Sequence, residues 1–209
     1  LLDAGERVVV LDDLSTGFRW AVPPQAASIV GDFGDSALVG ETLRQHDVRA
    51  IIHFAAKIVV PESVADPLLY YENNTAKARA LLAEAVRAGV PHFIFSSTAA
   101  VYGEPEDSPV TEESATAPIN PYGRSKLMVE WMLADVAAAH GLAYTALRYF
   151  NVAGADPQGR SGQSTPNATH LIKVAVQAAL GRRQGMDVYG VDYPTPDGSC
   201  LRDYIHVRS

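Results

Sequence analysis

Short apolar runs alternate along the chain with longer segments of helical periodicity. Five runs have the length and composition of buried strands, at residues 7–12, 27–32, 50–56, 92–97 and 144–150. They are apolar throughout, as is typical of parallel strands covered on both faces. Between them, apolar positions recur at helical spacing over Ser36–Gln45, 67–88 and 120–141. This alternation predicts an α/β fold with a doubly wound parallel sheet of the Rossmann type.

The segment 120–141 contains two residues that could act together in acid–base catalysis. Pro121 suits the first turn of a helix and Gly141 suits its end. Tyr122 and Lys126 are four residues apart, so they lie on one face of that helix. Because a nearby ammonium favours the phenolate, the pair predicts a tyrosine that accepts a proton near neutral pH. The alternative is a surface helix whose lysine extends past a half-buried tyrosine.

The pattern changes after Asn151. Residues 153–165 are rich in Gly, Ser, Gln and Pro and predict a surface loop, which a helix at about 167–180 follows. We therefore expect a dinucleotide-binding domain over residues 1–151 and part of a smaller, substrate-binding lobe over 152–209. The first residues resemble the last turn of a helix and lack an initiator Met. This predicts truncation at both ends, with the first strand and the glycine-rich loop missing.

Composition narrows the classes of partner. Hydrophobic residues make up 47% and charged residues 20% of the 209 residues, a balance that can bury a full core. The net charge of −7 favours neither nucleic acid nor an anionic membrane as partner. The single cysteine, Cys200, fits a reducing compartment, and no apolar run reaches membrane-spanning length. We expect a soluble cytoplasmic protein without a metal site.

Polar residues follow several predicted strands, at the sheet edge where open parallel sheets bind ligands. Asp12 and Asp13 follow the first run, where a carboxylate can bond the ribose hydroxyls of a dinucleotide. A turn-initiating aspartate is an equal alternative. Asp32 follows the next run and could bond an adenine amino group, whereas Asp35 suits a helix cap.

Three further positions have two interpretations each. His53 is expected to be a core histidine rather than a catalyst. The small residues after it leave room for a cofactor, or for a tight strand-to-helix crossing. Asn74 lies inside a helix, where a contact to a ribose or to a backbone carbonyl would offset its poor propensity; an exposed face is the alternative. Thr98 lies deepest in a hydroxyl-rich loop and could relay a proton beside Tyr122.

Several strings of residues carry a family resemblance over nearly the whole chain: LDDL, GDF, IIHFAA, ESVADPLLYYENN, FSSTAAVYG, PYGRSK, LRYFN and DYPTPDGSCLRDYIHV. With these strings the chain resembles the extended short-chain dehydrogenase/reductase family, and within it the epimerases that act on carbon 4 of UDP-hexoses. The resemblance implies NAD as cofactor, a UDP-sugar as substrate and a transient 4-keto sugar. It implies the catalytic residues Thr98, Tyr122 and Lys126.

The resemblance also implies the binding residues. The NAD site would comprise Asp12, Asp13, Asp32, Phe33, Phe54, Ala55, Ala56, Asn74, Ser97, Tyr122, Lys126 and Phe150. The UDP-sugar would contact Thr98, Tyr122, Asn151, His170, Leu171, Val188, Tyr189 and Arg202. The chain departs from the family pattern at Ala56, Ile58 and His170, where glycine, lysine and asparagine are common. A homodimer through the helices at 67–88 and 120–141 is also implied.

Other functions on the same fold remain as alternatives. A 4,6-dehydratase or a UDP-glucuronate decarboxylase usually has acidic residues just after the loop threonine, where this chain has Ala99 and Ala100. A UDP-pentose 4-epimerase and a non-catalytic binding protein are further alternatives, and Thr98, Tyr122 and Lys126 argue against the latter. The 209 residues alone are expected to bind NAD poorly and to show no turnover.

Overall fold

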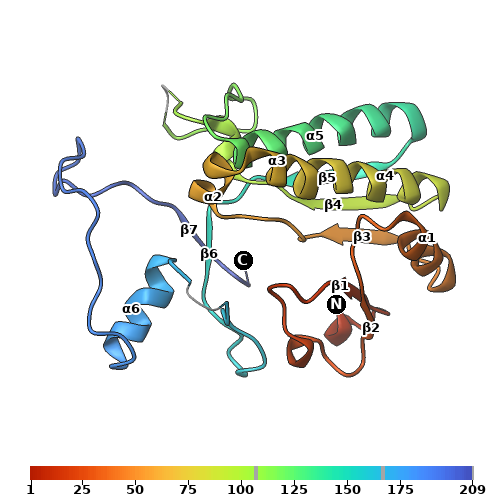
Figure 1. The fold of residues 1–209 in the computed structure, drawn as a ribbon, viewed down its shortest axis with the longest axis horizontal. Helices are drawn as coiled ribbons and strands as arrows, with labels where there is room; N and C mark the ends of the chain where they lie inside the picture. Colours follow the sequence, from red (N-terminus) through yellow and green to blue (C-terminus); the bar gives the residue numbers. More distant parts are fainter. Residues whose placement is uncertain (106–107, 166–167, 209) are drawn as a thin grey trace. The chain divides into compact units, whose positions relative to one another are not determined.

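A computed structural model describes residues 1–105, 108–165 and 168–208. It divides into two compact units, Leu1–Tyr149 and Phe150–Ser209, which we call the first and second units. Figure 1 shows the helices and strands of both. Among the described residues, no helix is long and apolar enough to cross a bilayer.

All strands of the first unit pair in parallel. Strand β1 (Val9–Asp12) pairs with β2 (Ala27–Val30). Strands β3 (Ala50–His53), β4 (His92–Ser96) and β5 (Ala143–Leu147) form a second sheet in that order. The predicted parallel α/β fold is therefore confirmed. Strand β1 ends at the predicted residue, Asp12, and the other four strands end before the predicted residues. Beyond those ends the backbone turns, as at Asp32, whose side chain accepts from the Gly34 N–H at 2.8 Å.

Local capping signals set the ends of two helices. Helix α1 (Ser36–Gln45) has the predicted bounds, and Asp35 caps it as predicted by accepting from the Ala37 and Leu38 N–H groups. Helix α5 (Pro121–His140) begins where the Asn120 side chain accepts from the Gly123 N–H at 2.9 Å. It ends at Gly141, whose left-handed φ of 72° glycine adopts without strain.

The predicted helix at 67–88 has three parts. Helix α3 (Pro67–Tyr70) continues into a π-helical segment, η3 (Tyr71–Ala76), and then into α4 (Lys77–Arg87). A short α2 (Val60–Ala65), which the sequence analysis missed, precedes them. The described residues of this unit also form three 3₁₀ turns: η1 (Leu2–Ala4), η2 (Arg19–Ala21) and η4 (Ala99–Tyr102).

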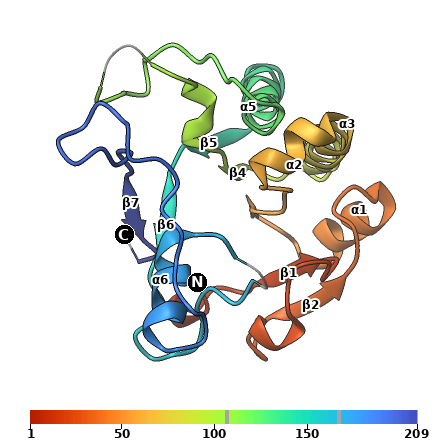
Figure 2. The same cartoon turned by 60° about the vertical axis from the view of Figure 1, so that its left-hand side comes forward.

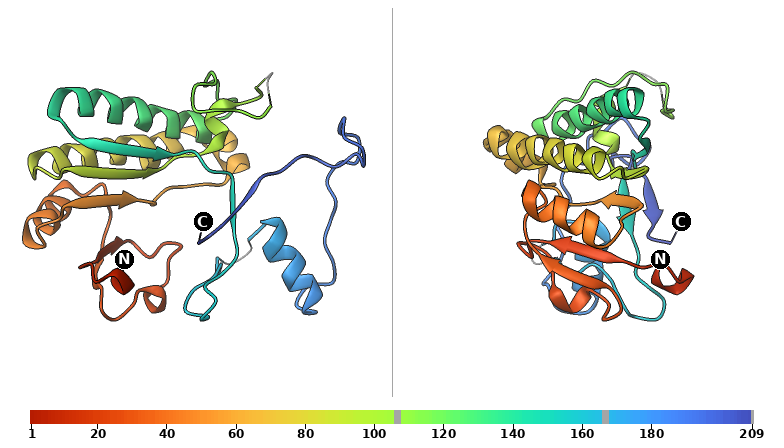
Figure 3. Two further views of the ribbon diagram at one scale, coloured as in Figure 1. Left: turned by 180° about the vertical axis from the view of Figure 1, so that it is seen from behind. Right: turned by 90° about the vertical axis from the view of Figure 1, so that its right-hand side faces the viewer.

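The core of the first unit lies between one layer of helices and the sheet. Buried side chains from α1, α4 and α5 pack against Phe93 and Phe95 of β4. Figure 3 shows these helices on the same side of the strands. On the opposite face of the sheet, Ile52 and Leu147 are 37% and 38% exposed.

The second unit has little regular structure. Strands β6 (Asn151–Ala153) and β7 (Tyr204–His206) pair in parallel, as Figure 2 shows. Helix α6 (Leu171–Ala179) begins later than the predicted residue 167. Asn167 itself lies outside the described residues.

Candidate active site

Three polar residues meet at the carboxyl end of β4. Thr98 lies just beyond that strand, and its side chain hydrogen-bonds the Tyr122 phenol. Lys126, one helical turn further along α5, is 2% exposed. Its Nζ donates to the Ser96 carbonyl at 2.9 Å and lies 4.9 Å from the centre of the Phe95 ring. The structure therefore brings together the predicted Thr98, Tyr122 and Lys126, at the edge where such sheets bind ligands.

Burial dominates the acid–base properties of this cluster. It raises the pKa of Tyr122, and the opposing hydrogen bond from Thr98 does not offset it. Burial also lowers the pKa of Lys126 to about 8. The expectation that Lys126 depresses the pKa of Tyr122 is therefore wrong for this structure. The ammonium is directed at the Ser96 carbonyl, and desolvation of the phenol is the larger effect.

The loop after β3 is fastened to the helix that follows it. Asn74 is 2% exposed; its Oδ1 accepts from the Lys57 N–H and its Nδ2 donates to the Lys57 carbonyl, both at 2.9 Å. The Tyr70 hydroxyl bonds the N–H and the carbonyl of Val59 at 2.8 and 2.7 Å. The interpretation that Asn74 lies on an exposed face of its helix is therefore wrong. The interpretation that it contacts a backbone carbonyl is confirmed. Sequence reasoning missed Tyr70, which has no chemical signal in its local pattern.

The residues directly after β3, which precede the segment bonded to Asn74 and Tyr70, are largely accessible to solvent. Phe54 is 63% exposed, Ala55 is exposed and Ala56 is half-buried. His53 is 4% exposed and packs between Phe33 and Phe95, with ring centroids 4.9 and 5.8 Å away. Burial lowers the pKa of His53 to about 3, which keeps the ring neutral. His53 is therefore a core histidine, as predicted.

Carboxylates gather at the ends of β1 and β2 around one lysine. Lys77 Nζ lies 2.5 Å from Asp32 Oδ2, and this bond, with one from the Gly34 N–H, holds the pKa of Asp32 low despite the opposing effect of burial. Bonds from Ser15 and the charge of Lys77 lower the pKa of Asp13. Sequence reasoning missed Lys77, because its partner lies 45 residues away.

Asp12 and Phe33 complete this end of the sheet. Asp12 Oδ1 accepts from the Leu14 N–H at 2.7 Å, as a turn-forming aspartate does. A Cβ at Gly17 would lie 2.7 Å from the other Asp12 oxygen, so the glycine leaves space for the carboxylate. Phe33 is half-buried, with Lys77 Nζ 6.0 Å from its ring centre.

The second unit contains the predicted substrate residues other than Thr98 and Tyr122, as well as Phe150. Asn151 donates to the carbonyl of Asp203, the residue that follows Arg202, at 2.9 Å. His170 bonds Gln163 through ring nitrogen Nδ1 at 2.8 Å. The other members are exposed: Phe150 and Leu171, the irregular Val188 and Tyr189, and Arg202.

The comparisons with known proteins agree with this geometry. Residues 1–209 match the model of the NAD dependent epimerase/dehydratase family. The chain belongs to this family. It is 59% identical over 207 residues to a UDP-glucose 4-epimerase of Azospirillum brasilense, covering 99% of this chain and 60% of the relative. It is 47% identical to one of Lacticaseibacillus casei, covering 99% and 62%. The chain thus spans about three fifths of these relatives.

Solved structures give the same assignment. A UDP-glucose 4-epimerase from Brucella ovis in complex with NAD superposes with a TM-score of 0.94 at 48% identity, covering 99% of this chain and 63% of that one. One from Bifidobacterium longum in complex with NAD⁺ and UDP has a TM-score of 0.91 at 38% identity, covering 99% and 65%. The epimerase/dehydratase fold expected from the sequence is therefore confirmed.

This member of the epimerase/dehydratase family has a polar network behind the site that sequence reasoning missed. Glu130 of α5 forms an ion pair with Arg148, with Nη2 2.6 Å from Oε2. Ser97, 2% exposed, donates to Glu130 Oε1. The sequence feature that could have indicated this network is Arg148, a charged residue within the otherwise apolar run at 144–150. No group of three or more potential metal ligands occurs in the described ranges.

Proposed function

We propose that the full-length protein catalyses the NAD-dependent epimerisation of a UDP-hexose at carbon 4, interconverting UDP-glucose and UDP-galactose through a transient 4-keto sugar. The observation that carries the proposal is the cluster of Thr98, Tyr122 and Lys126 at the carboxyl end of β4. It occurs in a chain 59% identical to a UDP-glucose 4-epimerase.

The residues at the sheet edge fit NAD. Ribose hydroxyls are hydrogen-bond donors, and the carboxylates of Asp12, Asp13 and Asp32 are acceptors at the ends of β1 and β2. The exposed side chains of Phe54 and Ala55 offer a surface on which a flat ring can lie. The remaining proposed cofactor contacts come from Phe33, Ala56, Asn74, Ser97, Tyr122, Lys126 and Phe150. When bound, the oxidised nicotinamide supplies the hydride acceptor and a positive charge.

Within this arrangement Tyr122 accepts the proton of the sugar's 4-hydroxyl, and Thr98 orients that hydroxyl. Burial opposes ionisation of Tyr122, because it raises the pKa of the phenol. The positive charge that oxidised NAD would supply favours the ionised form of a nearby phenol. Lys126, with its pKa lowered to about 8, donates hydrogen bonds and keeps most of its charge at neutral pH.

The rival reactions lack their acid–base groups here. A dehydratase or decarboxylase of this fold has acidic residues just after the loop threonine. At these positions Ala99 is 8% exposed and Ala100 is half-buried, both in η4. Two methyl groups can neither remove the carbon 5 proton nor protonate a leaving hydroxyl, so epimerisation is favoured.

The second unit supplies the proposed nucleotide contacts. The planar guanidinium of Arg202 suits a diphosphate, and it is exposed near Asn151. Val188 and Tyr189 are 72% and 83% exposed and offer apolar surface to a uracil. His170 and Leu171, at the start of α6, are further proposed contacts. We accordingly assign cofactor binding to residues 1–151 and substrate binding to 152–209.

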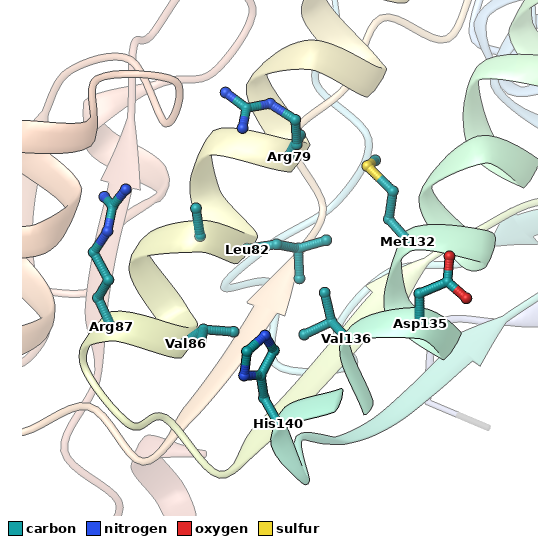
Figure 4. Close-up of a pocket in the computed structure, with 9 residues that line it drawn as sticks. Arg79, Leu82, Val86, Arg87, Met132, Asp135, Val136 and His140 are labelled. Atoms are coloured by element: carbon teal, nitrogen blue, oxygen red, sulfur yellow. The ribbon is translucent and has the colours of Figure 1, made fainter. Parts of the chain in front are cut away.

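A homodimer through α4 and α5 is part of the proposal. An apolar groove of about 400 Å³ lies between these helices (Figure 4). Arg79 on α4 and Asp135 on α5 border it. Side chains of both charges thus border an apolar surface, which is the arrangement of an interface with an apolar centre and a polar rim. We expect a dimer by light scattering and a monomer for Val136→Arg; a monomeric wild type would contradict the interface.

The lone Cys200 supports a cytoplasmic location.

Turnover of UDP-galactose by the full-length protein without added cofactor tests the function, with the product identified by chromatography. Tyr122→Phe is expected to lower kcat by about 100-fold or more, because a positioned acid–base group contributes about that much. Binding of UDP-sugar, measured by calorimetry, should persist. Tyr144→Phe on β5, a tyrosine that is 39% exposed, is the matched control. Retention of most of the rate by Tyr122→Phe would refute the assignment.

A further inference from the structure

Three residues on one face of α5 meet three consecutive residues at the end of β4, Ser96 to Thr98. Tyr122, Lys126 and Glu130 are spaced four apart, so they form one stripe along the helix. Tyr122 hydrogen-bonds Thr98, and Lys126 donates to the Ser96 carbonyl. Glu130 accepts from the Ser97 hydroxyl. The stripe therefore holds the segment 96–98 residue by residue.

Glu130 is the member of the stripe that the proposed reaction does not use. It is 7% exposed, and its two oxygens accept from Arg148 Nε at 3.1 and 3.0 Å and from Nη2 at 2.6 Å. Such a bidentate arrangement fixes the carboxylate in direction as well as in place. Ser97 therefore bonds a rigid acceptor.

Arg148 extends the same network beyond Thr98. Its Nη1 donates to the Tyr102 hydroxyl at 3.0 Å, and its guanidinium carbon lies 5.1 Å from the centre of the Tyr102 ring. Tyr102 is 7% exposed and ends η4, the turn that Thr98 caps. The pair of Glu130 and Arg148 thus holds the residue before Thr98 and the turn after it.

We propose that Glu130 and Arg148 are positioning residues, which hold the Thr98 hydroxyl against Tyr122 by fastening Ser97 on one side and Tyr102 on the other. This inference rests on the proposed function for its kinetic consequence, although the geometry stands without it. A buried ion pair is weak support for stability, since apolar residues of similar volume often replace it at no cost. A positional role is therefore the better account of why the pair lies here.

A stabilising role and a positioning role predict different behaviour of the same variants. If the pair only stabilises the fold, Glu130→Leu combined with Arg148→Met should retain activity together with the melting temperature. If it positions Thr98, the double variant keeps the fold and loses kcat. Glu130→Gln and Ser97→Ala weaken the link at separate points. Glu41→Gln removes an exposed carboxylate from α1 and is the matched control.

Kinetics on the full-length protein provide the first test. A misplacement of about 1 Å costs on the order of 100-fold in rate, so we expect kcat of Glu130→Gln to fall about 10- to 100-fold with KM within about twofold. In a Thr98→Val background, Glu130→Gln should have little further effect, because both changes remove the same interaction. An equal loss in both backgrounds, or an unchanged kcat, would overturn the inference.

Titration of Tyr122 by NMR, with ¹³C-labelled tyrosine, provides a test that needs no turnover. The Thr98 hydrogen bond lowers the pKa of Tyr122, so loss of its alignment should raise that pKa in Glu130→Gln and Ser97→Ala, as in Thr98→Val. Glu41→Gln should leave it unchanged. An unaltered titration in the two network variants would refute the positioning role. An inactive wild type would instead refute the proposed function, and the titration would still decide the inference.

Discussion

Replacing Asn74 with alanine is expected to destabilise the first unit through the loop after β3. Asn74 makes hydrogen bonds to the N–H and carbonyl of Lys57 and to the Ser125 hydroxyl, at 2.9, 2.9 and 3.1 Å. It is 2% exposed, so water does not replace these bonds within the folded helix. The substitution therefore removes the side-chain hydrogen bonds that hold the loop after β3 to the helix.

The magnitude follows from the three partners. Each lost hydrogen bond costs about 0.5–1.5 kcal/mol net. The lower half of that range applies, because Lys57 is half-buried and Ser125 keeps its bond to the Tyr122 carbonyl at 2.7 Å. Alanine returns about 0.5 kcal/mol through its better helix propensity. The expected net loss in the free energy of unfolding is about 2 kcal/mol.

Urea unfolding of the full-length protein, followed by circular dichroism, measures this loss as a shift in midpoint at constant slope. Asn73→Ala is the matched control, because Asn73 is only half-buried and donates to Asn74 alone. We expect the control to lie within about 0.5 kcal/mol of the wild type. Equal stabilities of the two variants would refute the idea that Asn74 holds the loop.

Two further predictions concern the core and the buried amine. Leu133→Ala, at a side chain with 0% exposure, should cost about 2–5 kcal/mol, whereas Leu68→Ala, at 76% exposure, should cost under about 1 kcal/mol in the same unfolding assay. Equal costs would contradict the core assignment. Burial lowers the pKa of Lys126 to about 8. The unfolded chain therefore binds more protons above that pH, and stability should rise between about pH 8 and 10.4 by roughly 3 kcal/mol. Lys126→Met should abolish that rise, and its persistence would show that other groups cause it.

Local rules account for the parts of the fold that the sequence predicted best. The bounds of α1 and its Asp35 cap were predicted, because a capping side chain bonds residues two or three positions away. The ends of the other strands, β2 to β5, were placed too late because apolar and small residues continue past them. A strand ends where its backbone stops pairing with the neighbouring strand, and that point depends on the conformation of the loop that follows.

Properties that depend on distant partners could not be predicted from the sequence. The raised pKa of Tyr122 follows from its burial in the folded chain, and the lysine one turn away does not offset it. The pair of Glu130 and Arg148 joins residues 18 positions apart, and Lys77 meets Asp32 across 45. A pattern read along the chain brings candidate groups to the same edge but does not orient them.

The π-helical segment η3 has a consequence for chain length. An extra residue in a helical turn shifts the phase of everything beyond it by about 100° relative to a regular α-helix. Upstream of that shift Tyr70 points at the β3 loop, and downstream Leu81 and Leu82 point into the core. Deleting one residue between Tyr71 and Ala76 would restore regular winding and turn one of these two sets away from its partner. Insertions and deletions should therefore be excluded from this stretch, although substitutions on its outer side are tolerated.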